Sequence, residues 1–267
     1  MGAGIAQVAA QAGLSVVLVD VQQAFIDKGL AGIKAQLEKA AAKGKLKEDA
    51  AAIFARVRGG SAQDARDAQF AVEAVTENEA VKKKVFADLA ASLSDTAILA
   101  TNTSSIPITR MAASVNNPER VIGMHFMNPV PVMALVEIIR GAQTSDETYA
   151  TTRALAEKLG KTTVLSKDMP GFIVNRILIP MINEACFALQ DGLATPEDID
   201  TAMKLGTNVP MGPLTLADFI GLDTVLYIAE VLHKGLGEDK YRPAPLLRQY
   251  VDAGWMGRKS KRGFYRY

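Results

Sequence analysis

Cysteine, histidine and tryptophan are scarce in this 267-residue chain, which has one cysteine, two histidines and one tryptophan. The lone Cys186 excludes an internal disulfide and is typical of a reducing compartment. We interpret it as a small, buried, apolar side chain on a helix. Long apolar runs are also absent: Phe172 to Leu178 is interrupted by Asn175 and Arg176, well short of a membrane span.

A surplus of charge of either sign is absent as well. The chain has 30 basic and 29 acidic residues, and 49% of its residues are apolar, as in a soluble globular protein. This balance provides no electrostatic attraction for nucleic acid or a membrane surface, so neither is predicted as a partner. No secretory signal is visible. The predicted location is the cytoplasm. The mitochondrial matrix is an alternative because the N-terminus looks incomplete.

Short β-rich runs alternate with helical stretches through the first two-thirds of the chain. The pattern predicts strands at 16–20, 70–75, 97–101, 121–125, 135–139 and 163–166. Several of these runs are almost continuously apolar, as expected for strands covered by helices on both faces. The alternation predicts a Rossmann-like, doubly wound, mostly parallel sheet.

Two helical regions depart from this rhythm. The Ala- and Lys-rich segment 24–57, interrupted at Gly44, is predicted to form a helical hairpin inserted into the α/β domain. After Lys167 the pattern predicts only helices, at 171–190, 195–205, 213–234 and 244–253. We therefore predict a Rossmann-like α/β domain at 1–168 and an all-α C-terminal domain at 169–267.

The opening stretch MGAGIAQVAAQAGLSVVLVD resembles the second half of a strand–turn–helix–strand unit without its first strand. Gly2 would be the last glycine of a dinucleotide fingerprint, which allows close packing of helix and strand. Asp20, at the end of the following strand, would accept hydrogen bonds from ribose hydroxyls and repel a 2′-phosphate. The pattern thus favours NAD over NADP, the alternative being an ordinary surface aspartate.

Polar side chains also follow two later strands. The runs Val75-Thr76-Glu77-Asn78 and Thr101-Asn102-Thr103-Ser104-Ser105 both lie where a strand ends. Ligands of open α/β sheets bind outside the carboxyl ends of the strands, so these side chains could reach a cofactor. They could instead serve only as helix N-caps, a common role of Ser, Thr and Asn.

One of the two histidines lies where catalysis is expected. His125 ends a predicted strand, and the prolines of the following turn lead into a strand that carries Glu137 among aliphatic residues. A carboxylate in such a strand requires a partner, and His125 is the nearest. Beside NAD, a His–Glu pair would remove a hydroxyl proton. The alternative is an exposed glutamate and an ordinary histidine; His233, near a helix end, needs only a structural role.

Five separated motifs carry a family resemblance. They are TNTSSIPIT, GMHFMNPVPVMALVEII, DMPGFIVNRI, GPLTLADFIGLD and the terminal GRKSKRGFYRY. Together they resemble the 3-hydroxyacyl-CoA dehydrogenase family, most closely its short-chain 3-hydroxybutyryl-CoA dehydrogenases. Family members begin with a strand followed by GAGTMG, whose last two residues match Met1-Gly2. The resemblance implies that the first strand and the first fingerprint glycines are missing from this chain.

The resemblance also implies roles for individual residues. His125 and Glu137 match the catalytic base and its partner, Ser104 a serine that contacts substrate and cofactor, and Asn175 an asparagine that completes the catalytic pocket. The residues that match the lining of the NAD site are Gly2, Asp20, Glu77, Lys82, Asn102, Ser104, Asn128 and Lys259. Lys43, on the helical hairpin, matches a lysine that contacts CoA, whereas Gln36 replaces a CoA-contacting serine of some relatives.

The expected activity is reversible, NAD-dependent oxidation of a short-chain (S)-3-hydroxyacyl-CoA, such as 3-hydroxybutyryl-CoA, in fatty-acid or butanoate metabolism. No metal site is predicted. A homodimer formed by the helical domain is expected from the resemblance and from helices that are apolar on more than one face. Two alternatives are a related hydroxyacid dehydrogenase that acts without CoA and a non-catalytic, truncated homologue that binds CoA or NAD.

Overall fold

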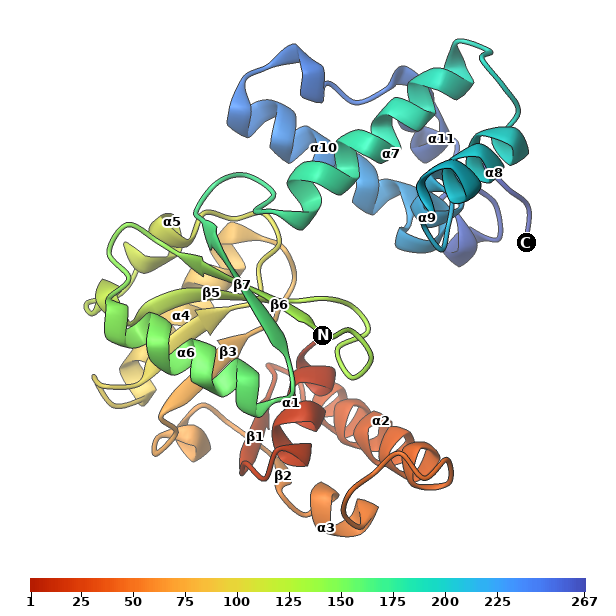
Figure 1. The fold of residues 1–267 in the computed structure, drawn as a ribbon. Helices are drawn as coiled ribbons and strands as arrows, with labels where there is room; N and C mark the ends of the chain where they lie inside the picture. The colour runs from red at the N-terminus through yellow and green to blue at the C-terminus, as the bar shows by residue number, and fades with distance from the viewer. The chain divides into compact units, whose positions relative to one another are not determined.

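The computed structural model describes residues 1 to 267 (Figure 1). It divides into two compact units, Met1–Met169 and Pro170–Tyr267. Each unit buries apolar clusters of its own. None of the helices combines the length and the apolar composition that a membrane crossing requires.

The first unit is built on parallel strands. They are β1 (Val16–Val19), β2 (Val57–Gly60), β3 (Phe70–Glu73), β4 (Ile98–Thr101), β5 (Val121–Phe126), β6 (Leu135–Arg140) and β7 (Thr162–Lys167). β1 and β2 form one sheet, and β3 to β7 form a second sheet in sequence order. All neighbouring strands are parallel except β5 and β6, which are antiparallel. The prediction of a mostly parallel sheet is confirmed.

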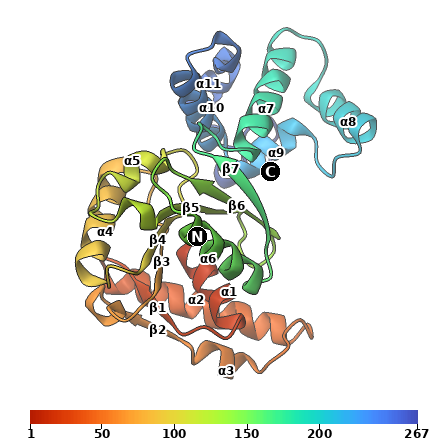
Figure 2. The same ribbon diagram turned by 60° about the vertical axis from the view of Figure 1, so that its left-hand side comes forward.

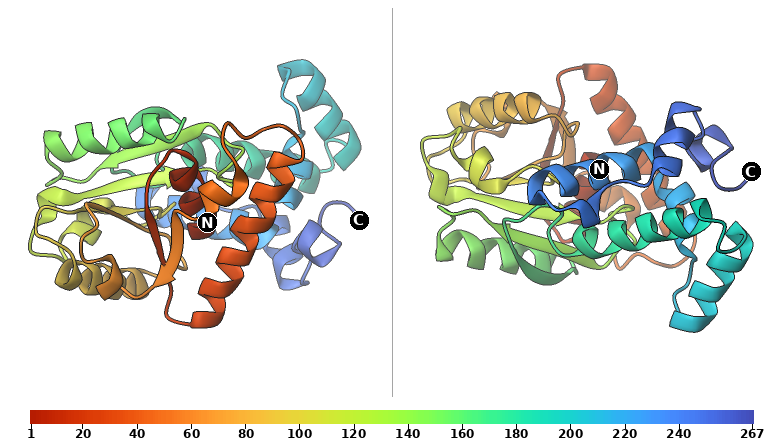
Figure 3. Two further views of the ribbon diagram at one scale, coloured as in Figure 1. Left: turned by 90° about the horizontal axis from the view of Figure 1, so that it is seen from below. Right: turned by 90° about the horizontal axis from the view of Figure 1, so that it is seen from above.

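Helices cover both faces of the five-stranded sheet. Figure 3 shows α6 on one face and α4 with α5 on the other. The helices of this unit are α1 (Gly2–Gln11), α2 (Gln23–Ala41), α3 (Ala50–Phe54), α4 (Glu79–Ser92), α5 (Ile108–Ala112) and α6 (Asp146–Lys158). Capping explains where some of them begin: Ser145 Oγ accepts from the amide of Thr148 at the start of α6. Two 3₁₀ turns, Gln63–Ala65 and Pro118–Arg120, complete the unit.

Helix α1 joins two apolar clusters. Ile5 and Val8 pack with strands β4 to β6, whereas Ala6 and Ala10 pack with α2 and β2. Helical periodicity places these two pairs on nearly opposite faces of the helix, so one short helix contacts both sheets. This packing holds the N-terminus of α1 beside the end of β3, where a Cβ on Gly2 would lie 3.9 Å from Ala74 Cβ.

The sequence pattern does not predict strand β2, because Val57-Arg58-Gly59-Gly60 contains no apolar run. The segment 24–57 was expected to be a helical hairpin, and it forms α2 and α3 before entering this strand. Tertiary packing explains the glycine: a Cβ on Gly59 would lie 2.5 Å from Ile26 Cγ2 on α2. Helix α2 therefore lies directly against the backbone of β2.

The second unit is entirely helical (Figure 2). Its elements are α7 (Val174–Gln190), α8 (Pro196–Thr207), α9 (Pro213–Ile220), α10 (Leu222–Leu236), α11 (Pro245–Asp252) and the 3₁₀ turns Asp239–Tyr241 and Arg258–Ser260. The single helix predicted at 213–234 is two helices, because the chain turns at Gly221 with φ of 103°. Both helices still contribute to one core, with Leu214 and Val225 fully buried.

Candidate active site

The candidate site lies where strands β3, β4 and β5 end. These strands are neighbours and run parallel, so their carboxyl ends meet at one edge of the sheet. Glu77 follows β3, the loop Asn102–Ser105 follows β4, and His125 is the penultimate residue of β5. The structure thus brings together polar groups that are far apart in the sequence.

His125 and Glu137 are direct cross-strand partners. They occupy opposite positions in the antiparallel pair β5–β6, and His125 Nδ1 lies 2.8 Å from Glu137 Oε2. The Glu137 side chain is fully buried and that of His125 is 10% exposed. The imidazole gives the buried carboxylate the partner that such a group requires. Met124 and Ile138, which precede His125 and follow Glu137, point to the opposite face of the sheet and are fully buried.

This geometry determines which imidazole nitrogen is available for chemistry. A carboxylate beside Nδ1 favours the tautomer in which Nδ1 carries the hydrogen and donates it to Glu137. In this tautomer Nε2 carries the lone pair that can accept a proton from a hydroxyl group. When the ring becomes cationic, the adjacent carboxylate stabilises it. The pair is therefore equipped for general base catalysis.

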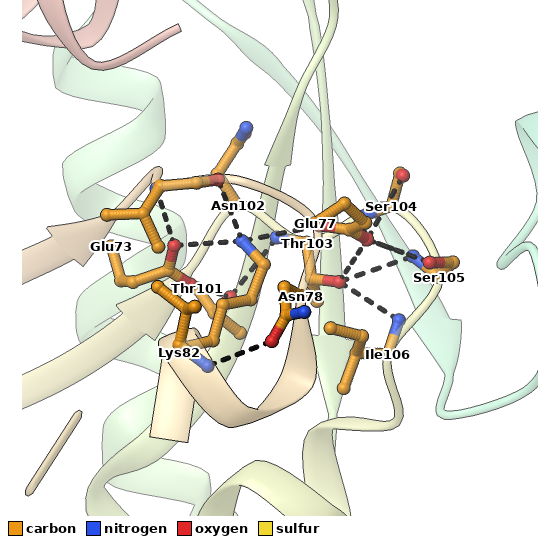
Figure 4. A network of polar contacts seen from close by, with 12 residues as sticks. Glu73, Glu77, Asn78, Lys82, Thr101, Asn102, Thr103, Ser104, Ser105 and Ile106 are labelled. Carbon is orange, nitrogen blue, oxygen red and sulfur yellow. Dashed lines mark hydrogen bonds and ion pairs between the residues drawn. The ribbon is translucent and has the colours of Figure 1, made fainter. Parts of the chain in front are cut away.

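The Asn102–Ser105 loop is organised by a single carboxylate (Figure 4). Glu77 Oε1 accepts from the hydroxyls of Thr103 at 2.6 Å, Ser105 at 2.8 Å and Ser104 at 3.2 Å. It also accepts from the amides of Ser104 and Ser105, at 2.9 and 3.0 Å. The Ser104 hydroxyl makes the longest of these contacts. Of the three loop hydroxyls it is therefore the one that can most easily turn from Glu77 toward a ligand.

These contacts determine the charge state of Glu77. Burial by itself would raise the pKa of this carboxyl group, but the Thr103 hydroxyl and the nearby Lys82 ammonium lower it, as do the donors of Ser104 and Ser105. The result is a pKa of Glu77 below its ordinary value of 4.5. Glu77 is consequently a carboxylate throughout the neutral pH range.

A second carboxylate, Glu73, lies beneath the loop at the end of β3, and it was not among the predicted site residues. Its side chain is fully buried, with Oε1 2.8 Å from Lys82 Nζ and Oε2 accepting from the Thr101 hydroxyl at 2.6 Å. Lys82 Nζ also lies 3.3 Å from Glu77 Oε2. Two glutamates thus share one buried lysine (Figure 4). The signal for Glu73 was the same as for Glu137, a carboxylate in an apolar strand.

Lys82 was predicted to line the cofactor site, and in the structure its ammonium lies between the carboxylates of Glu73 and Glu77. Its side chain is 1% exposed, and its ammonium also donates to the carbonyl of Val75 at 3.3 Å. Asn102 connects two strand ends, because its Oδ1 accepts from the amide of Phe126 at 2.8 Å. Asn128 is exposed on the turn that follows β5.

The arrangement at α1 fits a dinucleotide. Gly2 is the first residue of this helix, and no side chain caps its N-terminus. Free amides at a helix N-terminus attract anions such as a pyrophosphate. Asp20 is exposed immediately after β1, where it can accept hydrogen bonds from a ribose. Lys43, the predicted CoA contact, is exposed just beyond the end of α2.

Two predicted site residues belong to the second unit. Asn175 is 9% exposed and lies in the first turn of α7. Lys259 lies in the C-terminal tail, where its ammonium donates to Asp223 of α10. The tail itself is held by Asp218, whose carboxylate accepts from the amides of Phe264 and Tyr265, each at 2.9 Å.

Comparison with known proteins matches both units to one family. Residues 1–169 match the model of the 3-hydroxyacyl-CoA dehydrogenase NAD-binding domain, and residues 171–267 match that of the C-terminal domain of the same enzymes. A probable 3-hydroxybutyryl-CoA dehydrogenase of Bacillus subtilis is 55% identical over all of this chain and 94% of its own length. A 3-hydroxybutyryl-CoA dehydrogenase of Bradyrhizobium diazoefficiens is 52% identical over all of this chain and 92% of its own length.

Solved structures agree with the sequence comparison. The crystal structure of (S)-3-hydroxybutyryl-CoA dehydrogenase from Ralstonia eutropha superposes with a TM-score of 0.97 at 51% identity, over all of this chain and 95% of that one. The predicted resemblance is thereby confirmed on sequence and on structure. The chain belongs to the 3-hydroxyacyl-CoA dehydrogenase family, and it is an NAD-dependent oxidoreductase.

Proposed function

We propose that this enzyme oxidises short-chain (S)-3-hydroxyacyl-CoA thioesters, such as 3-hydroxybutyryl-CoA, reversibly to the 3-ketoacyl-CoA. The observation that carries the proposal is the His125–Glu137 pair, 2.8 Å apart where strand β5 ends. The relatives named for 3-hydroxybutyryl-CoA, which align with all of this chain, support the short-chain substrate.

In the proposed mechanism, His125 acts as the general base. Nε2 accepts the proton of the C3 hydroxyl group, while Glu137 holds the ring through Nδ1 and stabilises its positive charge. NAD supplies the acceptor for the hydride that leaves C3. In the reverse direction the imidazolium returns the proton to the C3 oxygen, so the same two residues serve both directions.

Ser104 and Asn175 are proposed to orient the substrate. The Ser104 hydroxyl can turn from its 3.2 Å contact with Glu77 and donate to an oxygen atom of the ligand. Asn175 would donate to the C3 oxygen or to the thioester carbonyl. Donors at these positions stabilise the negative charge that develops on oxygen during the reaction.

The cofactor and CoA contacts extend over several elements. For NAD we propose the α1 N-terminus at Gly2, the ribose acceptor Asp20, and polar groups at the strand ends and in the tail. These are Glu77, Lys82, Asn102, Ser104, Asn128 and Lys259. Asp20 would exclude NADP by repelling its 2′-phosphate. Lys43 would bind a phosphate of CoA, and Ser104 would contact the acyl end of the substrate.

We also propose a homodimer formed by the helical unit, in the cytoplasm. The support for the dimer is large apolar side chains on the surface of that unit, such as Ile177 at 68% and Phe219 at 53% exposure. Burying such groups between two copies is the usual gain of a two-fold interface. Sedimentation velocity at micromolar concentration should show a dimer, and a stable monomer would remove this part of the proposal.

The two histidines allow a matched test of the mechanism. His125→Gln should lower kcat for NADH oxidation with acetoacetyl-CoA by roughly two to four orders of magnitude, the usual contribution of a general acid–base residue. His233→Gln, which changes the second histidine at the end of α10, should leave kcat unchanged. The affinity for NADH, measured by its fluorescence, should be retained in both variants.

The substrate is tested with the same assay. The wild-type enzyme should reduce acetoacetyl-CoA and show far lower activity with free acetoacetate. Equal activity with the free acid would indicate a hydroxyacid dehydrogenase that does not use CoA. A protein that binds CoA or NADH without turnover would be non-catalytic. Full activity of His125→Gln would contradict the proposed base.

A further inference from the structure

The turn that joins β5 to β6 is held in place from two sides. It spans residues 127–134, between His125 and Glu137 in the sequence, and it carries Asn128, one of the residues proposed for the NAD site. Val130 is the one buried residue of this turn, and most of the others are exposed. The apolar contacts of the turn are therefore few, and its position depends on the groups that hold it.

On one side the turn is held by a buried ammonium. Lys161 lies between α6 and β7 and is 8% exposed. Its Nζ donates to the carbonyl of Val130 at 2.6 Å and to that of Met133 at 2.8 Å. Burial lowers the pKa of this ammonium below its ordinary value of 10.5, because neither carbonyl carries a charge that would offset the lost hydration.

Stability alone does not explain a lysine at this position. Lys82, the other buried lysine, lies between two carboxylates that balance its charge. The ammonium of Lys161 has two carbonyls as its acceptors, and burying a charge without a counter-charge lowers the stability of a fold. Its effect is local: it joins the carbonyls of Val130 and Met133 at one point and thereby fixes the shape of the turn.

On the other side the turn lies against the first turn of helix α1. A Cβ built on Gly4 would lie 3.1 Å from Val130 Cβ and 3.6 Å from Pro131 Cδ, so a larger residue would require the turn to shift. Val130 also belongs to the apolar cluster that contains Ile5 and Val8 of α1. This is the uncapped end of α1, where the pyrophosphate of a dinucleotide is expected.

We propose that Lys161 is a positioning residue for NAD, which holds the 127–134 turn against α1 and so sets the affinity for the dinucleotide without touching it. The turn fixes Asn128 relative to the N-terminus of α1, and both belong to the proposed cofactor site. His125 and Glu137 are aligned by the β5–β6 pairing rather than by the turn, so proton transfer should depend little on Lys161. This inference rests on the proposed placement of NAD.

Lys161→Met tests the proposal, because it removes the ammonium at nearly constant side-chain size. NADH binding, measured by fluorescence titration without acyl-CoA, should weaken by roughly 5- to 50-fold, the scale of two lost hydrogen bonds. The kcat for acetoacetyl-CoA at saturating NADH should stay within about three-fold of the wild type, since the loss is one of binding. Lys158→Met, which changes an exposed lysine at the end of α6, should leave both constants unchanged.

Gly4→Ala disturbs the same turn from the opposite side and should also weaken NADH binding. Gly206→Ala is its control, because this glycine of α8 has no atom within 4 Å of its Cβ position, and NADH binding should be unchanged. If Gly4→Ala and Lys161→Met both act by displacing the turn, the double variant should weaken NADH binding by less than the product of the two single effects.

The outcomes separate positioning from a purely structural role. A lower melting temperature of Lys161→Met with wild-type affinity for NADH would overturn the proposal, as would independent effects in the double variant. If Lys161→Met does not fold, wild-type affinity for NADH in Gly4→Ala would overturn it instead. A wild-type enzyme that binds NADH without reducing acetoacetyl-CoA would contradict the proposed substrate only, because the NADH titrations contain no acyl-CoA.

Discussion

At the scale of single residues, three glutamates lie at or below the strand ends, and their partners give them different roles. Glu137 faces an imidazole, Glu77 faces hydroxyl and amide donors of a loop, and Glu73 faces a buried ammonium. The imidazole can become cationic, the loop groups donate hydrogen bonds, and the ammonium balances the negative charge of its partner. These differences in partner allow each residue to be tested by a different measurement.

Glu137→Gln should reduce kcat almost as strongly as His125→Gln, by roughly two or more orders of magnitude. The glutamine amide keeps the size of the side chain but loses the charge that stabilises the imidazolium. Steady-state kinetics with acetoacetyl-CoA and NADH measure this loss, and NADH fluorescence titration should show retained cofactor affinity. A fully active Glu137→Gln enzyme would show that the histidine works without its partner.

The depressed pKa of Glu77 predicts a pH-dependent contribution to stability. The unfolded glutamate has the higher pKa, so it takes up a proton first as the pH falls, and the folded state is destabilised. The contribution is complete above the ordinary value of 4.5 and is lost as the pH falls through the lower folded value. The Glu77→Gln variant lacks this pH-dependent contribution to stability.

Urea unfolding of wild type and Glu77→Gln between neutral and acidic pH measures the effect. At neutral pH the variant should be less stable by about 1–3 kcal/mol, because five donors lose a charged acceptor. The difference between the two proteins should shrink as the pH falls below 4.5. A difference that stays constant over the whole range would mean that Glu77 has the same pKa in the folded and the unfolded protein.

At the scale of elements, helix α4 contains two adjacent lysines in opposite environments. Lys82 is 1% exposed between Glu73 and Glu77, whereas Lys83 is 38% exposed and pairs with Glu79 one turn earlier. Removing one partner of a buried ion pair leaves an unbalanced charge in the interior. An exposed pair is solvated and contributes little. The same substitution should therefore give very different results at the two positions.

Lys82→Met should lower the free energy of unfolding by about 3–5 kcal/mol, and Lys83→Met by about 0.5 kcal/mol or less. Chemical denaturation monitored by circular dichroism measures both values. Because Lys82 supports Glu77, its variant should also raise KM or lower kcat, whereas Lys83→Met should keep both constants. Equal losses of stability in the two variants would contradict the buried pair.

The strands show how far local pattern predicts this fold. Continuous apolar runs predict β4 and β5 closely, because a strand buried on both faces needs apolar side chains throughout. Strand β2 has no such run, since its Gly59 is required by contact with α2. The helix break at Gly221 is equally hidden, because the apolar spacing continues into the same core. Structural features that depend on contacts between distant residues, such as these two, produce no periodic pattern in the local sequence.

The site follows the same rule. His125 and Glu137 could be paired from the sequence because a short turn between two strands makes them neighbours. The link from Glu77 to the Asn102–Ser105 loop spans more than 20 residues and depends on two parallel strands lying side by side. Glu73 carried a readable signal, but its partner Lys82 lies on the following helix, where a lysine is normally exposed.

At the scale of the whole molecule, each unit has its own core. Most of the proposed catalytic and cofactor-binding residues lie in the first unit. The second unit encloses a cluster built from α7 to α11, which includes the fully buried Cys186. As the one cysteine of the chain, it is a natural probe of that core. Its reactivity reports whether the helical unit opens under native conditions.

Cys186 should resist thiol reagents as long as the helical unit is folded. Burial, with a further effect of the Asp218 charge, raises the pKa of the thiol to about 12, so very little reactive thiolate exists at pH values near 8. Ellman's reagent should therefore label the native enzyme far more slowly than glutathione, and should label one equivalent once urea unfolds it. In a urea series, pulse labelling should follow the loss of helical circular dichroism. Rapid labelling of a full equivalent without denaturant would show that the core around α7 opens readily and that the thiol is not shielded as the structure indicates.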